Sequence, residues 1–211
     1  TDKKTTNGKR ILFLIATFFL FTAIALFLSF VSYFTTGNYD QSIVELMSNQ
    51  EIHADNWLGK FGAYLANLFI YDGFGIASFL FVKIALALAI YFSFKYAAVK
   101  LRRLIFWDLF AIIILSIALG HFGENYLYLG GKVGFEINDY FQSYLGHMGT
   151  MLLVIFAIIF YLIFRIKMSP DRFTNIVNGA KNTINENISK AEELIKNQED
   201  EKPFSPSPTL S

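Results

Sequence analysis

The sequence has no cysteine in its 211 residues, which excludes disulfide bonds, thiolate zinc sites and thiol catalysis. It has no excess of charge either, and a formal net charge of +1 indicates no particular partner. A Gly-x4-Gly-Lys-Ser/Thr phosphate loop, a His-Glu-x-x-His motif and a nucleophile elbow are also absent. Gly131 and Lys132 are adjacent, but they lack the glycine spacing of a phosphate loop. We therefore expect no catalytic site, cofactor or metal in this chain, no ATP hydrolysis and no DNA binding.

Apolar residues are abundant: 54% of the sequence is hydrophobic, and the mean hydropathy is +0.43. A soluble domain needs a polar shell, whereas a bilayer stabilises long apolar runs. Four runs are long enough to cross a hydrocarbon core of about 30 Å at about 1.5 Å per residue. These expected spans are residues 11–34, 74–94, 104–122 and 147–166. The sequence therefore predicts an all-α integral membrane protein with four transmembrane helices.

Basic residues predict the orientation of these spans, because short cytoplasmic loops are enriched in lysine and arginine. The loops 35–73 and 123–146 contain one basic residue each, Lys60 and Lys132. The remaining segments carry Lys3, Lys4, Lys9 and Arg10, then Lys95, Lys100, Arg102 and Arg103, and finally Lys167 and Arg172. We predict that both termini are cytoplasmic (N-in, C-in) and that the two longer loops are extracytoplasmic.

Both outer loops carry apolar residues at helical spacing, which predicts amphipathic helices over 56–71 and 134–145. The apolar stripes are Trp57, Leu58, Phe61, Tyr64, Leu65, Leu68 and Phe69 in the first loop, and Ile137, Phe141, Tyr144 and Leu145 in the second. Such helices can lie in the membrane interface with the stripe turned to lipid or protein. They can also cap the bundle as soluble helices, and both alternatives stay open.

Glycines mark the ends of the predicted outer helices. Gly73 and Gly75 stand where the first outer helix turns into the second span, and Gly146 and Gly149 stand at the matching place before the fourth. Glycine permits a sharp turn and lets two backbones approach closely. The full set of expected turn glycines is Gly59, Gly62, Gly73, Gly75, Gly130, Gly131, Gly134, Gly146 and Gly149.

The two halves of the chain are similar in sequence. Residues 58–71 align with 130–143 without a gap, and four pairs are identical: Gly59 with Gly131, Lys60 with Lys132, Gly62 with Gly134, and Phe69 with Phe141. Both halves also enter and return in the same direction. We predict a parallel duplication about an axis along the membrane normal. The alternative is convergence of two interfacial helices on similar composition.

Lys83 lies near the middle of the second span, where a charge is costly. The favoured interpretation is a lysine whose stem lets the ammonium reach water. The alternative is a protein partner, for which Asp108 in the third span is the nearest acid in depth. His121 and His147 flank the second outer loop without metal-ligand spacing, so we expect interface histidines.

These patterns divide the chain into a basic cytoplasmic N-terminus (1–10), a four-helix membrane domain (11–168), a cytoplasmic amphipathic helix (169–198) and a linker (199–211). Ser169, Pro170 and Asp171 form a helix-start signal. The residues after Glu199 are charged and then rich in proline and serine, which is typical of a flexible linker. We expect this chain to be part of a longer protein with further domains beyond residue 211.

Four spans, a long first outer loop and a proline-rich cytoplasmic exit resemble the membrane anchor of the FtsK/SpoIIIE DNA translocases. The similar stretches are 56–81 and 129–154. In the second, a Gly-Gly-x-x-Gly opening precedes an amphipathic helix and a Gly-x-x-Gly entry into the last span. The resemblance covers about residues 11–168. It implies a bacterial inner-membrane protein at the division septum, acting in chromosome partition. It also implies a hexamer, septal protein partners and contact with DNA only through a separate ATPase motor.

Two other functions remain open from the residues alone. A small transporter or channel subunit is favoured by Lys83, the glycine breaks and the apparent duplication. However, the spans carry no ring of acids or amides that would line a path. The membrane half of a sensor is the third hypothesis, with the helix 169–198 leading to an output domain.

Overall fold

The computed structural model describes residues 2–43, 53–94, 98–166, 174–175, 178–179 and 181–190. All regular secondary structure in these residues is helical. Four stretches of helix are long and apolar enough to cross a membrane: Asn7–Gly37, Gly59–Phe94, Ala98–Gly120 and Glu124–Arg165. The predicted four-helix membrane fold is therefore confirmed. The third helix ends at Gly120, two residues before the predicted end of the third span.

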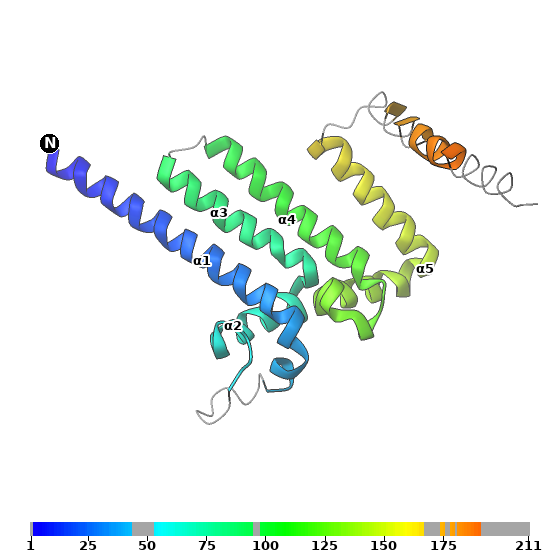
Figure 1. Cartoon of the computed structure of the whole chain (residues 1–211), viewed down its shortest axis with the longest axis horizontal. Coiled ribbons are helices and arrows are strands. Elements are labelled where there is room, and N and C mark those ends of the chain that lie inside the picture. The colour runs from blue at the N-terminus through cyan, green and yellow to red at the C-terminus, as the bar shows by residue number, and fades with distance from the viewer. Residues whose placement is uncertain are drawn as a thin grey trace, which may run out of the picture. The chain divides into compact units, whose positions relative to one another are not determined.

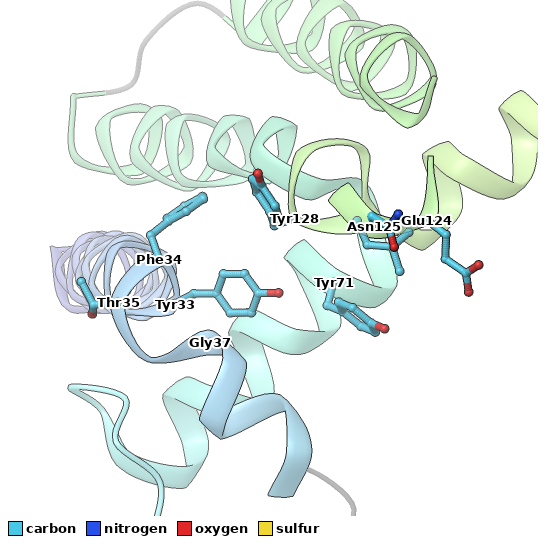
Figure 2. Close-up of a pocket in the computed structure, with 9 residues that line it drawn as sticks. Tyr33, Phe34, Thr35, Gly37, Tyr71, Glu124, Asn125 and Tyr128 are labelled. Atoms are coloured by element: carbon cyan, nitrogen blue, oxygen red, sulfur yellow. The ribbon is translucent and has the colours of Figure 1, made fainter. Parts of the chain in front are cut away.

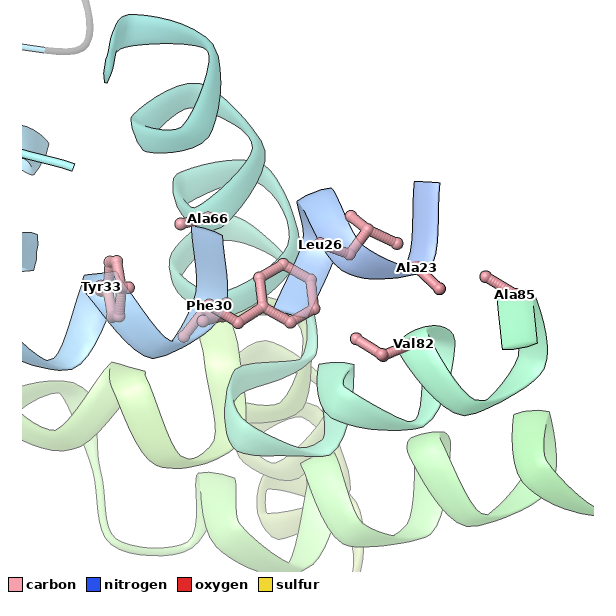
Figure 3. Close-up of a cluster of buried hydrophobic side chains, with 8 residues drawn as sticks. Ala23, Leu26, Phe30, Tyr33, Ala66, Val82 and Ala85 are labelled. Carbon is pink, nitrogen blue, oxygen red and sulfur yellow. The ribbon is translucent and has the colours of Figure 1, made fainter. Parts of the chain in front are cut away.

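The first hairpin consists of α1 (Asp2–Ile43) and α3 (Phe79–Phe94), which pack side by side (Figure 1). At one end of this pair, α2 (Gly59–Ala66) and the π-helix η2 (Asn67–Phe74) also pack on α1. The core between them is shown in Figure 3 and contains Ala23, Leu26, Phe30, Tyr33, Ala66, Ile70, Val82 and Ala85. Phe30 is fully buried, and its ring lies 5.5 Å from Phe79 and 5.8 Å from Phe69, measured between centroids.

The first outer segment is less regular than the single α-helix predicted over 56–71. It starts at Gly59, changes to π geometry at Asn67, and leaves helical geometry at Gly73. A 3-10 turn, η3 (Gly75–Ser78), then leads into α3. A hydrogen bond of 2.6 Å from Asn67 Nδ2 to Asp72 Oδ2 links the two ends of the π stretch, a local interaction that helical periodicity does not encode.

The side chains of α2 sort by size. Gly62, Ala63 and Ala66 are buried against the bundle, so the small residues make the protein contact. Most of the larger residues of the predicted stripe are exposed: Trp57, Phe61, Tyr64 and Leu68. A small buried face allows close helix approach, and the large apolar residues then face the surroundings. This arrangement fits an interfacial helix with its stripe turned outward better than a soluble cap.

The second hairpin consists of α4 (Ala98–Gly120) and α5 (Leu127–Ile166), joined by the 3-10 turn η4 (Glu124–Tyr126). Two glycines interrupt α5: Gly131 has φ 71° and Gly146 has φ 68°. The segment between them is the second outer helix, and the last part of α5 is the fourth span. Trp107 of α4 packs on α5 with ring centroids 6.3 Å from Phe160 and 5.8 Å from Tyr161.

The described residues after the fourth span belong to a separate compact unit that starts at Leu162. Residues 181–190 are helical, and so are the short described pieces 174–175 and 178–179. The other residues of the predicted helix 169–198 lie outside the described residues. The predicted linker 199–211 lies outside them entirely.

Candidate functional site: the joint between two helical hairpins

An ion pair joins the two hairpins within the membrane-spanning helices. Lys83 Nζ of α3 lies 2.8 Å from Asp108 Oδ1 of α4. The Asp108 side chain is fully buried, whereas the Lys83 side chain is 48% exposed. The lysine therefore ends on the acid, the alternative that the sequence left open, rather than only extending toward water. In an apolar surrounding an unpaired charge is costly, so this pair stabilises the contact between α3 and α4.

The acid of this pair is only half satisfied. Asp108 Oδ2 is buried without a hydrogen-bond partner, as is Asn67 Oδ1 in the first outer segment. A carboxylate oxygen without a partner in a low-dielectric surrounding is unfavourable, which makes Asp108 depend on Lys83.

Glycine backbones form the second contact between the hairpins. Gly73 and Gly75, before α3, touch the backbone of Leu129–Gly131 at the start of α5. A Cβ built at Gly75 would overlap Leu129 O, and one at Gly131 would overlap Gly73 O. Both Gly75 (φ 63°) and Gly131 also adopt left-handed φ angles. Only glycine meets both requirements at this crossing.

The other expected glycines fall into three groups. Gly130 and Gly134 pack against α4, where a side chain would overlap Gly120 or Ser116. A side chain at Gly62 would overlap Asn56. Gly59 and Gly146 have positive φ but open space around the Cβ position, and Gly149 lies within α5, close to Leu145.

Small polar side chains tie each outer segment to the first span of its own hairpin, and sequence reasoning missed them. Ser29 Oγ donates to Gly62 O, and Asn56 Nδ2 donates to Ser29 O at 3.1 Å. In the second hairpin Ser116 Oγ donates to Gly130 O, and Asn138 Nδ2 donates to Ile117 O at 3.1 Å. Serine within an apolar span was the available signal, because a buried hydroxyl needs a partner.

A cavity of about 290 Å³ opens between the end of α1 and η4 (Figure 2). Its lining combines three phenols and one carboxylate: Tyr33, Tyr71 and Tyr128, with Glu124. These residues come from both hairpins, so the cavity depends on the joint. No ligand chemistry is specified by this lining beyond aromatic and hydrogen-bonding contacts.

The sequence matches one protein-family model over most of its length. The family described as the 4TM region of DNA translocase FtsK/SpoIIIE matches residues 9–177. The chain belongs to this family. The resemblance noted in the sequence is thereby confirmed. No curated protein sequence and no solved structure matches the chain.

Membership in the FtsK/SpoIIIE 4TM family identifies the described helices as the membrane anchor region of a translocase, a non-catalytic region. Within the described part of the chain, no group of three or more His, Cys, Asp or Glu side chains could hold a metal ion. The candidate site consists of the contacts that join the two hairpins: the Lys83–Asp108 pair, the glycine crossing and the cavity beside η4.

Proposed function

We propose that this FtsK/SpoIIIE 4TM region holds an ATP-driven DNA translocase at the division septum, in the bacterial inner membrane, during chromosome partition. The observation that carries the proposal is the family match over residues 9–177 together with four apolar helices. The motor would follow residue 211, beyond a cytoplasmic helix (169–198) and a linker (199–211). The described helices would supply position and the motor would supply DNA contact and ATP turnover.

The test is the localisation of residues 1–211 fused to a fluorescent protein, in cells that keep the native translocase. We expect a band at mid-cell in dividing cells. A fusion that is intact and inserted, yet spread evenly around the cell, would contradict septal targeting. A fusion of residues 98–166 alone is the matched control, because it lacks the first hairpin and the glycine crossing.

The proposed topology places both termini in the cytoplasm. It is supported by the basic segments at the start of α1 and at the start of α4, which lie at the same end of the bundle (Figure 1). Reporter fusions at positions 50 and 135 should read as extracytoplasmic, and one at position 99 as cytoplasmic. The opposite reading at position 99 would overturn the topology.

A hexamer is part of the same proposal. The fourth span leaves most of its apolar surface uncovered in the single chain, since 6% of its most apolar window is buried against 39% in the second span. Lipid or neighbouring copies could cover such a face. Native mass spectrometry from nanodiscs should give six copies, and a stable monomer at all protein-to-lipid ratios would contradict it.

A transporter is the second candidate, because Lys83 and Asp108 put charges inside the spans. The two charges neutralise each other and lie beside no described channel. Proteoliposomes of the chain should therefore show no ion flux above empty liposomes. Flux that is lost when Lys83 is replaced by methionine would favour the transporter.

A further inference from the structure

Two histidines from different helices face each other at the outer end of the second hairpin. His121 follows the end of α4, and His147 follows the glycine break in α5, so the residues are 26 positions apart. Their Nε2 atoms lie 3.1 Å apart, and their ring centroids lie 4.2 Å apart. His147 is exposed and His121 is partly exposed, so the pair is accessible at the protein surface.

A chain of hydrogen bonds sets the tautomer of His147. Asn138 Nδ2 donates to Ile117 O at 3.1 Å, which leaves Asn138 Oδ1 as an acceptor for Gln142 Nε2. Gln142 Oε1 then points to His147 Nδ1 at 3.3 Å. An amide oxygen only accepts, so the Nδ1 of His147 carries the proton and its Nε2 presents a lone pair toward His121.

His147 has the arrangement that metal-binding histidines adopt. A ligating imidazole donates its other N–H to a carbonyl or carboxylate, which fixes the ring and raises its basicity. Zinc binds imidazole nitrogen at about 2.0–2.1 Å, and two such bonds that meet at about 100° span the observed Nε2–Nε2 separation. The neutral His121 ring can exchange its proton with water to carry it on Nδ1, and this tautomer presents an Nε2 lone pair.

We propose that His121 and His147 bind a zinc ion, with water in the remaining coordination positions. Imidazole nitrogen suits zinc and the neighbouring transition metals and suits magnesium poorly. A bound ion would clamp the end of α4 to the first turn of the fourth span, across the Gly146 break. Gln142 is a positioning residue, because it acts through His147.

The test measures zinc binding to residues 1–211 in nanodiscs by calorimetry, after removal of any polyhistidine tag. Wild type should bind one zinc ion saturably and should not bind magnesium. His121→Gln and His147→Gln should each weaken zinc binding at least tenfold. His53→Gln is the matched control, since His53 is the third histidine of the chain and lies in the other outer loop, and it should bind as wild type does.

Two variants of Gln142 test the positioning role. Gln142→Leu removes the acceptor and should weaken zinc binding about tenfold, the lower end of the cost of losing such a partner. Gln142→Glu supplies a carboxylate acceptor and should keep or strengthen binding. Cobalt(II) substituted for zinc should give the visible absorption of a four-coordinate ion in wild type and in His53→Gln.

Helicity by circular dichroism shows whether each variant folds. Absence of saturable zinc binding by the folded wild type would overturn the proposal. Equal zinc affinity in wild type and in both single-histidine variants would overturn it too, because the ion would then be bound elsewhere.

Discussion

The two hairpins use the same contacts at their outer ends and differ in how they fill their interiors. In each first span a serine hydroxyl donates to a glycine carbonyl: Ser29 to Gly62 within the first outer segment, and Ser116 to Gly130, directly before the second. Each outer segment also lies between two glycines of positive φ, Gly59 and Gly75 in the first, Gly131 and Gly146 in the second. The first hairpin then adds an aromatic core around Phe30.

The two hairpins therefore have similar glycine and serine contacts at their outer ends, but their spans pack differently. In the first hairpin, Val82 and Ala85 of the returning span are buried against α1, beside Leu26 and Phe30. The fourth span instead exposes residues such as Leu152, Phe156 and Ile163, while its outer segment is held by backbone contacts. In a bilayer such exposure carries little penalty, because lipid tails are as apolar as the side chains. The duplication itself stays a prediction. The positive φ of the aligned glycines Gly59 and Gly131 supports it, whereas the two serines bond to glycines that the alignment does not pair.

The largest expected effect comes from Gly131→Ala at the crossing between the hairpins. A left-handed φ costs an ordinary residue about 1–2 kcal/mol, and forced overlap with Gly73 O adds about 1–3 kcal/mol. We expect a loss of about 4 kcal/mol in the free energy of unfolding, measured by circular dichroism in mixed micelles.

Gly146→Ala is the matched control for this substitution. Its φ is also positive, but nothing lies within 4 Å of the added Cβ. It should lose only the conformational part, about 1–2 kcal/mol. Equal losses at the two glycines would show that the backbone contact at Gly131 is not a tight one.

The second prediction concerns the ion pair that links α3 to α4. Lys83→Met removes the one hydrogen-bond partner that the structure gives the fully buried Asp108 carboxylate, and should destabilise the chain by about 3 kcal/mol. Asp108→Asn should cost less, because the half-exposed Lys83 can still extend toward water. The double variant Lys83→Met/Asp108→Leu should recover most of the stability. A double variant as unstable as the sum of the two single variants would show that the pair is not coupled.

Sequence reasoning reached the four spans and the break at Gly146 because hydropathy and glycine are local signals. It also named Gly131 among the turn glycines, but it missed the π stretch after Asn67 and the pairing of His121 with His147. The first depends on a side-chain hydrogen bond to Asp72, and the second depends on which side chains meet in three dimensions. Lys83 shows the same limit: depth along the helices pointed to Asp108, but periodicity could not say that the two side chains face each other.

The smallest expected effect tests the similarity of the hairpins most directly. Ser29→Ala and Ser116→Ala each remove one hydroxyl that donates to a glycine carbonyl of the outer segment. Both serines are buried, at 0% and 1% exposure, so neither carbonyl gains water in exchange. Hydrogen bonds between membrane helices contribute about 0.6 kcal/mol on average, and we expect losses of about that size at both positions. Thr22→Ala is the control, because Thr22 bonds to Phe18 O within its own helix and should change stability least.

Equal losses at the two serines, although only the first lies beside the aromatic core, would show that the serine contact stabilises both hairpins in the same way. A loss confined to Ser29→Ala would show instead that the aromatic packing around Phe30, and not the repeated serine contact, holds the outer segments in place.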